Sequence, residues 1–407
     1  MSISTFDLDS TAAGTGATVS FTEQTEVFLF PNATLTTSGG SPGRVDSITV
    51  TLSGATATES MSVAAATLTS LGMTGSYNSA TGVLTLSKSN GTDADWVTAL
   101  KAVTYNNSSD TPSSSSRSIT VVATDTSGPT TSTTNATINV TAVNDAPVNT
   151  VPGAQSAIED SSKVIAGLAI SDPDAGSATV TTTLSVLNGT ITVATVGGGA
   201  SVSGSGTGTV TLTGTVAQIN ATLAALNSVT YQGNANFNGA DTLTMTTNDG
   251  GNSGSGGAKS DTDTVSISVS AVNDAPVNTV PGAQSATEDT AKAITGLAVS
   301  DIDAGSGTIT TTLSVLHGTI TVATVGGGAS VSGSGTDTVT LTGTVAQINA
   351  TLAALNAVTY VGDANFNGSD TLTMTTNDGG NSGSGGALSD TDTVAISVSA
   401  VNDAPVN

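Results

Sequence analysis

The side chains of this chain that could do chemistry are mostly carboxylates, and they recur at fixed spacings. Asp172-Pro-Asp174 and Asp261-Thr-Asp263 each place two carboxylates one residue apart, and Asn273-Asp274 adds an amide. Carboxylates so spaced in a turn can point at the same space, and Ca²⁺ takes about six to eight oxygen ligands. With no cysteine and one histidine, the donor set favours Ca²⁺ over a transition metal. Asp is also common in turns, where it binds backbone N–H groups, so a purely structural role stays open.

The charge balance excludes several classes of partner. The chain has 407 residues, of which 31 are acidic and 7 are basic, for a net charge of −24. Without Lys and Arg clusters, nucleic acid and anionic membrane surfaces are not expected partners. No run of apolar residues is long enough to span a membrane, and the first residues do not read as a signal peptide. The chain is therefore expected to be a fragment, or to be exported by a route that reads another signal.

Internal repetition is the strongest feature of the sequence. The string Ala-Val-Asn-Asp-Ala-Pro-Val-Asn occurs at 142–149, 271–278 and 400–407. Residues 146–274 align without gaps to 275–403, with 17 differences in 129 positions. Residues 1–145 form a divergent copy, because 99–107 matches 225–233 and 138–145 matches 267–274. The predicted domains are therefore 1–145, 146–274 and 275–403, with 404–407 as the start of the next junction.

Within one copy the apolar residues alternate with period two, which predicts strands. Segments 177–187, 190–196, 209–213, 241–247 and 262–272 fit this pattern, and Asn188-Gly189 indicates a hairpin. Val216, Ile219, Leu223 and Leu226 instead follow helical spacing after the N-cap candidate Thr215. In the first copy Trp96, Leu100 and Val103 occupy the same places. The fold class is therefore all-β: tandem β-sandwich domains, each with one short helix or helical turn.

The junction motif resembles a known family. Ala-Val-Asn-Asp-Ala-Pro looks like the linker between cadherin domains, Ile158-Glu159-Asp160 resembles the cadherin Glu motif, and Asp172-Pro-Asp174 resembles the D-x-D of the following domain. The two later copies resemble the cadherin-like repeats of large bacterial surface adhesins, many of them RTX-type proteins secreted through a C-terminal signal. The resemblance implies an Ig/cadherin-like sandwich and Ca²⁺ between the domains.

The resemblance also implies a set of metal ligands. Ala142 and Ala146 replace two ligands of the full cadherin linker, so weaker binding or fewer ions are expected. Segment 37–43 lacks the D-x-D expected there, so the first copy is expected to lack an N-terminal site. The implied calcium ligands are Asn144, Asp145, Asp172 and Asp174 at the first junction, Asn273, Asp274, Asp301 and Asp303 at the second, and Glu159 and Glu288 as further candidates.

Together these observations predict a non-enzymatic, extracellular repeat array of a bacterial surface. Ca²⁺ at the junctions would stiffen a stalk of an adhesin or filament, whose partners would be neighbouring copies or another surface molecule. His317 is expected in a turn, and the glycine-rich segment 250–257 is expected to be a flexible loop. Two alternatives stay open. One is a self-assembling surface-layer or fibre subunit, which exposed strand edges would favour. The other is a polysaccharide-binding module, for which an aromatic patch around Trp96 would be the sign.

Overall fold

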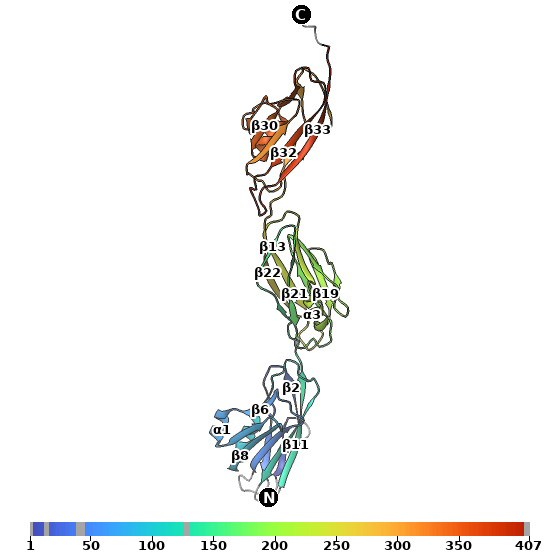
Figure 1. Cartoon of the computed structure of the whole chain (residues 1–407). Helices are drawn as coiled ribbons and strands as arrows, with labels where there is room; N and C mark the ends of the chain where they lie inside the picture. Colours follow the sequence, from blue (N-terminus) through green and yellow to red (C-terminus); the bar gives the residue numbers. More distant parts are fainter. Residues whose placement is uncertain (1–2, 12–15, 38–44, 126–129, 403–407) are drawn as a thin grey trace.

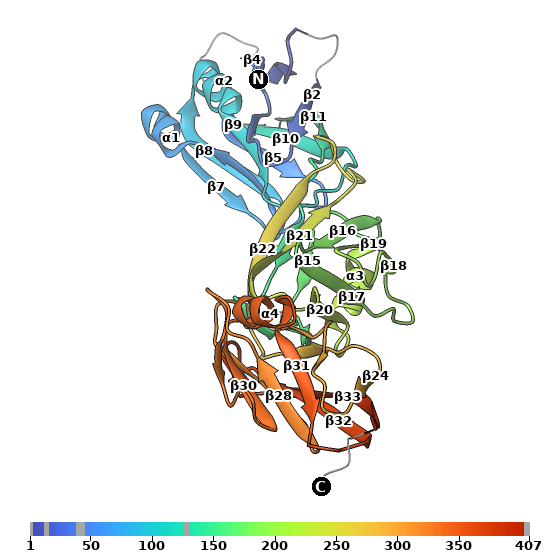
Figure 2. The ribbon, with the colours of Figure 1, turned by 90° about the horizontal axis from the view of Figure 1, so that it is seen from above.

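A computed structural model describes residues 3–11, 16–37, 45–125 and 130–402. Most of the segment at 37–43 and the predicted junction start at 404–407 lie outside these residues. The chain forms three units in a row, with its two ends at opposite ends of an elongated molecule (Figure 1). A second view shows the same order of units (Figure 2). The three units have separate sheets and separate hydrophobic cores.

The first unit is a sandwich of a six-stranded sheet, in the order β2-β11-β10-β5-β8-β7, and a three-stranded sheet, β3-β9-β6. A small β1-β4 pair completes it. Its elements are β1 (Ile3–Asp7), β2 (Ala17–Thr22), β3 (Val27–Phe28), β4 (Thr34–Thr37), β5 (Val45–Leu52), β6 (Glu59–Val63), α1 (Ala65–Leu71), β7 (Thr74–Asn78), β8 (Val83–Gly91), α2 (Asp93–Lys101), β9 (Val103–Asn107), β10 (Arg117–Asp125) and β11 (Thr130–Thr141).

The second unit repeats this plan with the sheets β13-β22-β21-β16-β19-β18, β14-β20-β17 and β12-β15. Its strand β13 pairs in parallel with its last strand, β22, from Gln155 opposite Ile267 to Ile158 opposite Ser270. Its elements are β12 (Val148–Thr150), β13 (Gln155–Ile158), β14 (Ser162–Val164), β15 (Ala169–Ser171), β16 (Val180–Ser185), β17 (Gly189–Val193), β18 (Ser201–Ser203), β19 (Thr209–Gly214), α3 (Val216–Ala224), β20 (Val229–Gly233), β21 (Gly239–Asn248) and β22 (Ser260–Ser270).

The third unit follows the second strand for strand, with the sheets β24-β33-β32-β27-β30-β29, β25-β31-β28 and β23-β26. Its elements are β23 (Val277–Thr279), β24 (Gln284–Thr287), β25 (Lys292–Ala293), β26 (Ala298–Ser300), β27 (Ile309–Ser314), β28 (Gly318–Val322), β29 (Ser330–Ser332), β30 (Thr338–Gly343), α4 (Val345–Ala353), β31 (Val358–Gly362), β32 (Gly368–Asn377) and β33 (Ser389–Ser399).

The predicted all-β class of tandem sandwiches is confirmed, and so is the helix in each later unit. The Thr215 side chain accepts from the Gln218 N–H, and Gln218 caps the Thr215 N–H in return. Ile219 and Leu223 are buried, but the helix ends at Ala224 and the Leu226 side chain is 92% exposed. Leu226 therefore does not extend the apolar face of the helix, contrary to the spacing argument.

Two further expectations were wrong. The first unit has two helices rather than one, because α1 precedes β7. Asn188-Gly189 does not form a hairpin, because β16 pairs with β19 and β21 while β17 pairs with β20 in the other sheet. The dipeptide instead lies where the chain crosses between sheets. Periodicity cannot separate these cases, since a strand alternates in the same way whichever sheet it joins.

Candidate metal centre at the junctions

The linker between the first two units is bound to the second unit. The Asn144 N–H donates to the Ser255 carbonyl over 2.8 Å, and the Ser255 N–H donates to the Ala142 carbonyl over 2.9 Å. Gly254 has φ +72°, and a Cβ there would lie 2.5 Å from the Asn144 nitrogen. Glycine is therefore required for the loop to meet the linker. The glycine-rich segment at 250–257 was expected to be a flexible loop. It instead forms the hydrogen bonds that hold the linker.

The Asn144 side chain strengthens this attachment. Its amide nitrogen donates to Asp249 Oδ2 over 2.6 Å and to the Gly257 carbonyl over 3.0 Å. Burial opposes the charge of Asp249, but hydrogen bonds from the Lys259 N–H and from Asn144 outweigh it and lower the pKa of Asp249. Asn273 makes the same contacts with Asp378 and Gly386. Both asparagines thus hold the linker through their amide nitrogens, and their role as metal ligands stays a prediction.

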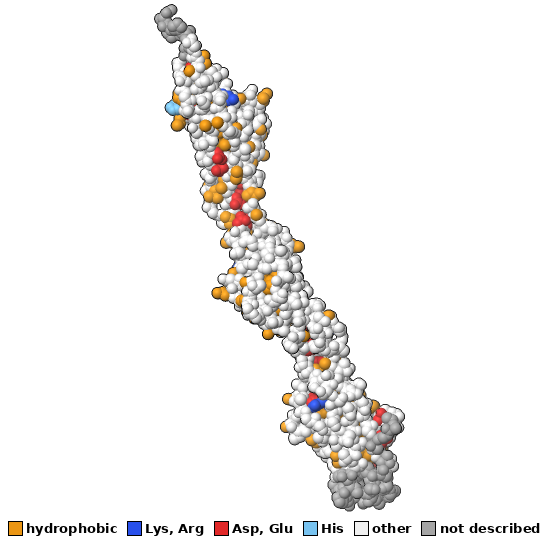
Figure 3. Space-filling model, turned by 90° about the vertical axis from the view of Figure 1, so that its right-hand side faces the viewer, with side chains coloured by type: hydrophobic (Ala, Val, Ile, Leu, Met, Phe, Trp, Pro, Cys, Tyr) orange, Lys and Arg blue, Asp and Glu red, His pale blue; other side chains and the backbone are white. Residues whose placement is uncertain are grey.

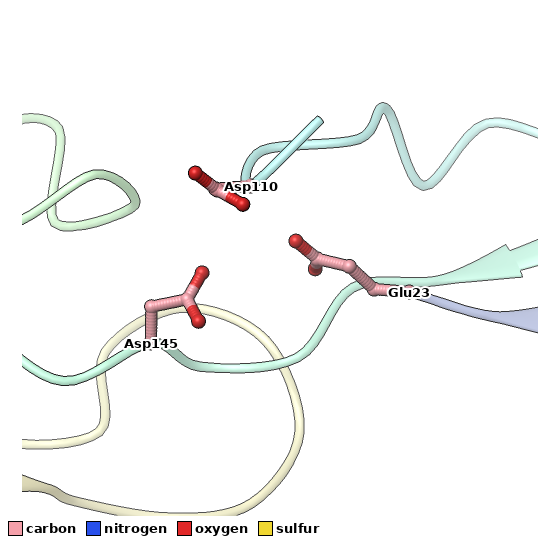
Figure 4. A group of neighbouring side chains, drawn as sticks. All are labelled: Glu23, Asp110 and Asp145. Carbon is pink, nitrogen blue, oxygen red and sulfur yellow. The ribbon is translucent and has the colours of Figure 1, made fainter. Parts of the chain in front are cut away.

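Three carboxylates converge at the first linker. Glu23 follows β2, Asp110 lies in the loop after β9, and Asp145 lies in the linker. One oxygen from each lies within 4.8 Å of the others, and the three side chains point toward one another (Figure 4). This is the one group of three such ligands found among the described residues.

Sequence reasoning found Asp145 but missed Glu23 and Asp110. A signal for Glu23 was present, because it ends an alternating strand in the same way that Glu159 does. The residue after each is in the left-handed region, with φ 59° at Gln24 and 56° at Asp160. Asp110 lies in the loop at 108–116, for which 234–238 in the second unit is a shorter counterpart. Alignment of the copies could not place it.

The D-x-D of the second unit completes the first junction. Asp174 Oδ2 accepts from the Asp145 N–H over 3.2 Å. Asp172 Oδ1 accepts from the N–H groups of Asp174 and Ala175 over 3.2 and 3.0 Å, which is the turn-forming role of Asp. The second oxygen of each side chain has no such partner. The D-x-D thus both builds a turn and leaves two oxygens available.

The first junction is rich in carboxylate oxygens that lack a hydrogen-bond donor. Glu23 is 3% exposed, and burial together with the nearby Asp145, Asp110 and Asp174 raises its pKa. Burial and the adjacent Asp174 raise the pKa of Asp172 to about 6. Burying an unpaired carboxylate is costly, so this arrangement favours a bound cation. The buried oxygens without a donor are Glu23 Oε1, Asp145 Oδ2, Asp172 Oδ2 and Asp174 Oδ1.

Basic side chains form no ion pair with these carboxylates among the described residues, although the charge of Lys259 acts to lower the pKa of Asp145 against the larger effects that raise it. Within the described part of the chain the ion pairs are Lys88–Asp95 and Arg117–Glu59, and neither lies at a junction. In the space-filling view, acidic side chains gather around the constriction between the second and third units (Figure 3).

The second junction has the same plan with different details. Asp303 Oδ2 accepts from the Asp274 N–H over 3.0 Å, and Asp301 Oδ2 and Asp303 Oδ1 are buried without a donor. Burial and the neighbouring Asp160, Asp303 and Glu159 raise the pKa of Asp274. Cavities of about 260 and 390 Å³ both have Asp274 in their walls. Asp274 of the linker therefore lies next to Asp301 and Asp303 of the D-x-D, as predicted positions of one junction.

The two glutamates lie at different places. Glu159 belongs to the second junction, where its carboxylate accepts from the Val272 N–H and from the Asn238 amide over 3.2 Å. Glu288 lies at the far end of the third unit, where it accepts from the Val401 N–H over 2.6 Å and from Asn367 over 3.3 Å. Glu288 therefore takes part in neither of the two junctions described.

Other predicted features have structural roles. Trp96 is fully buried and its Nε1 donates to the Val45 carbonyl over 2.9 Å, so the aromatic patch that would favour polysaccharide binding is not formed by Trp96. His317 lies in the turn after β27, as expected, and stacks on Phe366 with ring centroids 4.6 Å apart. Among the described residues, no helix has the length and apolar character needed to cross a membrane.

Comparisons with known proteins concern the fold alone. No family model matches the chain, and no curated protein matches it. Among solved structures, extracellular cadherin domains 1–5 of protocadherin gamma B2 match with 16% identity and a TM-score of 0.37, over 96% of this chain and 60% of that one. Mouse cadherin-23 EC22–24 matches with 17% identity and a TM-score of 0.34, over 96% and 97%. The titin I-band fragment I67–I69 matches with 10% identity and a TM-score of 0.21, over 99% and 100%. The chain thus spans about 60% of the protocadherin chain.

Proposed function

We propose that this chain is a non-enzymatic, extracellular array of units at 1–145, 146–274 and 275–403, whose junctions bind Ca²⁺. The array would serve as the stalk or spacer of a bacterial adhesin or surface filament. The observation that carries the proposal is the first junction. Carboxylates from the first unit, the linker and the second unit meet there, and Glu23 is buried with one oxygen that lacks a donor.

The donor set fits calcium better than its competitors. The free ligands are carboxylate oxygens, which suit a hard cation, and no nitrogen or sulfur ligand is among them. Glu23, Asp110 and Asp145 would hold the ion, with Asp172 and Asp174 available from the following unit. Mg²⁺ demands a tighter octahedral geometry and gives up its water reluctantly, so it suits such a site less well.

Binding would change the mechanics of the junction. In the absence of an ion, acids of two successive units face one another, and the nearby Asp145, Asp110 and Asp174 each disfavour the charged form of Glu23. Their repulsion would favour bending away from the straight arrangement. A bound cation turns the same groups into ligands shared by both units, which fixes their relative orientation.

The bacterial surface setting is supported by the sequence resemblance of the two later copies to adhesin repeats. The elongated row of units suits a spacer that holds a binding end away from a surface (Figure 1). The main alternative is a self-assembling subunit, which would need strand edges able to pair between chains. The edge strands of the sheets range from two residues in β25 to six in β2, and short edges resist such pairing. The stalk is therefore the better-supported proposal.

Calorimetric melting of the full chain with Ca²⁺ and with a chelator tests the proposal. A ligand at a hundred times its dissociation constant stabilises the folded state by about 2.7 kcal/mol, so the melting temperature should rise by several degrees. Small-angle scattering should show a longer maximum dimension with Ca²⁺, and Mg²⁺ at equal concentration should do less.

The control is Asp337→Asn, which removes one charge at an exposed position where the second unit has Gly208. This variant should keep the full response to Ca²⁺, whereas Glu23→Gln combined with Asp145→Asn should lose the part that comes from the first junction. An unchanged melting temperature of the parent chain on adding Ca²⁺ would refute the proposal.

A further inference from the structure

A pocket of about 240 Å³ lies in the first unit, against the loop that also carries the junction residue Asp110, although Asp110 itself is not in its wall. It is formed where β6 begins and where the loop at 108–116 connects β9 to β10. Ligand sites for drug-sized molecules are about 300–1,000 Å³, so this pocket suits a smaller ligand. The wall residues that matter here are Thr58, Glu59, Ser109, Thr111, Ser113 and Arg117.

The floor of the pocket is a rigid ion pair. Arg117 Nε donates to Glu59 Oε1 and Arg117 Nη2 donates to Glu59 Oε2, both over 2.7 Å, and Nη2 also donates to the Gly54 carbonyl. The Tyr105 hydroxyl donates to Glu59 Oε1 over 2.8 Å, and the Thr56 N–H and hydroxyl donate to Oε2. Burial opposes the charge of Glu59, yet these bonds lower its pKa overall. The floor therefore carries no net charge and does not depend on a ligand for its order.

The walls offer hydroxyl groups. The Ser109 oxygen accepts from the Thr111 N–H over 3.1 Å, and the Ser113 oxygen accepts from the Ser115 N–H over 3.4 Å. Each hydroxyl therefore keeps its own proton for another partner. The Thr111 hydroxyl and Arg117 Nη1 have no hydrogen-bond partner among the described residues. The pocket thus combines several free donors with an uncharged floor.

The second unit has different residues at the positions of Arg117 and Glu59. The strand pairing that sets Arg117 opposite Ile138 sets Asp241 opposite Ile267, so an acid stands where the first unit has Arg117. Gly189 stands opposite Gly233 where Glu59 stands opposite Asn107. In the second unit Tyr231 donates to Asp241 instead. The pocket is therefore specific to the first unit and does not follow from the sandwich fold.

We propose that this pocket binds a neutral hexose, free or as a unit of a glycan. Sugar hydroxyls both donate and accept, which matches a wall of hydroxyls, the Asn107 amide and a partly free guanidinium. An anionic sugar is disfavoured, because Glu59 already offsets the charge of Arg117 and the whole chain carries −24. The site would give the array a ligand-binding surface of its own, and its Glu59–Arg117 floor is formed without any junction carboxylate.

Calorimetric titration of the full chain with glucose, galactose and mannose tests the proposal, with glucuronate as the anionic probe. At least one neutral hexose should bind, and backbone amide shifts in NMR should be confined to 54–59 and 107–117. The test variant is Thr111→Val with Ser113→Ala, which removes two hydroxyls of the pocket and touches none of the groups that bind Glu59 or Arg117. It should weaken binding about tenfold, since each hydrogen bond contributes about 0.5–1.5 kcal/mol.

The matched control is Thr264→Val, an exposed threonine on β22 of the second unit, which should bind like the parent chain. Absence of binding by all three hexoses would overturn the proposal, and so would binding of glucuronate alone. Equal binding by the double variant and the parent would place the sugar elsewhere. Because each measurement is repeated with a chelator, failure of this site and failure of the calcium proposal are distinguishable.

Discussion

The two junctions have the same linker and the same D-x-D pattern. They differ in what the preceding unit contributes, and in Lys259 of the second unit, which Leu388 replaces in the third. At the first junction Glu23 keeps a buried oxygen without a donor, and Gln24 donates to Asp110 over 3.1 Å. At the second, both oxygens of Glu159 have donors, because the Asn238 amide donates to one and the Val272 N–H to the other. The acid near the glutamate also differs. In the first unit it is Asp110 of the 108–116 loop, and in the second unit it is Asp160, which directly follows Glu159.

This difference teaches that the number of acids does not decide how well a junction can hold a cation. An oxygen that already accepts hydrogen bonds loses them when it becomes a ligand, whereas an oxygen without a donor loses nothing. The first junction has four buried carboxylate oxygens without a donor, and the second junction has two. We therefore expect the first junction to bind Ca²⁺ more tightly.

The largest expected effect comes from Glu23→Gln. The change keeps an acceptor for the Val143 N–H but removes a charge from the three-carboxylate group, so Ca²⁺ affinity at the first junction should fall by at least about tenfold, or 1.4 kcal/mol. Glu159→Gln should cost less, because that carboxylate is already satisfied. Calorimetric Ca²⁺ titration of both variants measures the ratio. Equal losses in the two variants would contradict the ranking of the junctions.

A smaller effect is expected from making the second junction more like the first. Asn236 lies in the wall of both cavities beside Asp274, so Asn236→Asp should add a carboxylate there and raise affinity by a few-fold. Asn365→Asp is the matched control, because it is the same position in the third unit, beyond both junctions. A gain in the control equal to that in Asn236→Asp would show that added charge, not added ligation, is responsible.

The sequence predicts the architecture well because the evidence for it is local. Alternation of apolar residues marks most strands, and Thr215 with Gln218 marks the start of a helix. Pairing is not local, which is why the Asn188-Gly189 crossing was mistaken for a hairpin. The two helices of the first unit were undercounted, because α1 buries none of its residues and so leaves no clear apolar face.

The site was predicted in part for the same reason. The linker and the D-x-D of the following unit lie together, with the Asp145 N–H donating to Asp174, while their role as metal ligands stays a prediction. Glu23 and Asp110 belong to the preceding unit. They lie at the site because the end of β2 and the 108–116 loop come close to the linker in the fold. The resemblance of the linker motif to cadherins also could not show that the Asn144 amide nitrogen donates to Asp249. Candidate ligands within one motif can be proposed from the sequence, whereas carboxylates that converge from separate strands and loops can be found only from the fold.

The smallest expected effect concerns pH, and here the two junctions should behave alike. Burial and the adjacent Asp303 raise the pKa of Asp301 to about 6, as burial and Asp174 do for Asp172. A carboxyl whose folded-state pKa is raised binds more protons in the folded than in the unfolded state between about pH 4 and 6. The unfolding free energy of the metal-free chain should therefore fall as pH rises through this window, so the melting temperature should be a few degrees higher at pH 5 than at pH 7.

Asp172→Asn and Asp301→Asn sharpen this prediction, because each removes one titrating carboxyl and keeps an oxygen for the turn. Each variant should reduce the difference in melting temperature between pH 5 and pH 7 by a similar amount. Asp249 and Asp378 have lowered pKa values, so their contribution to the unfolding free energy is lost only at more acid pH. They therefore do not affect the difference between pH 5 and pH 7. If saturating Ca²⁺ is present, the order should reverse, because protons and the cation compete for the same oxygens. A metal-free chain that is more stable at pH 7 than at pH 5 would show that the junction acids are compensated in a way that their geometry does not indicate.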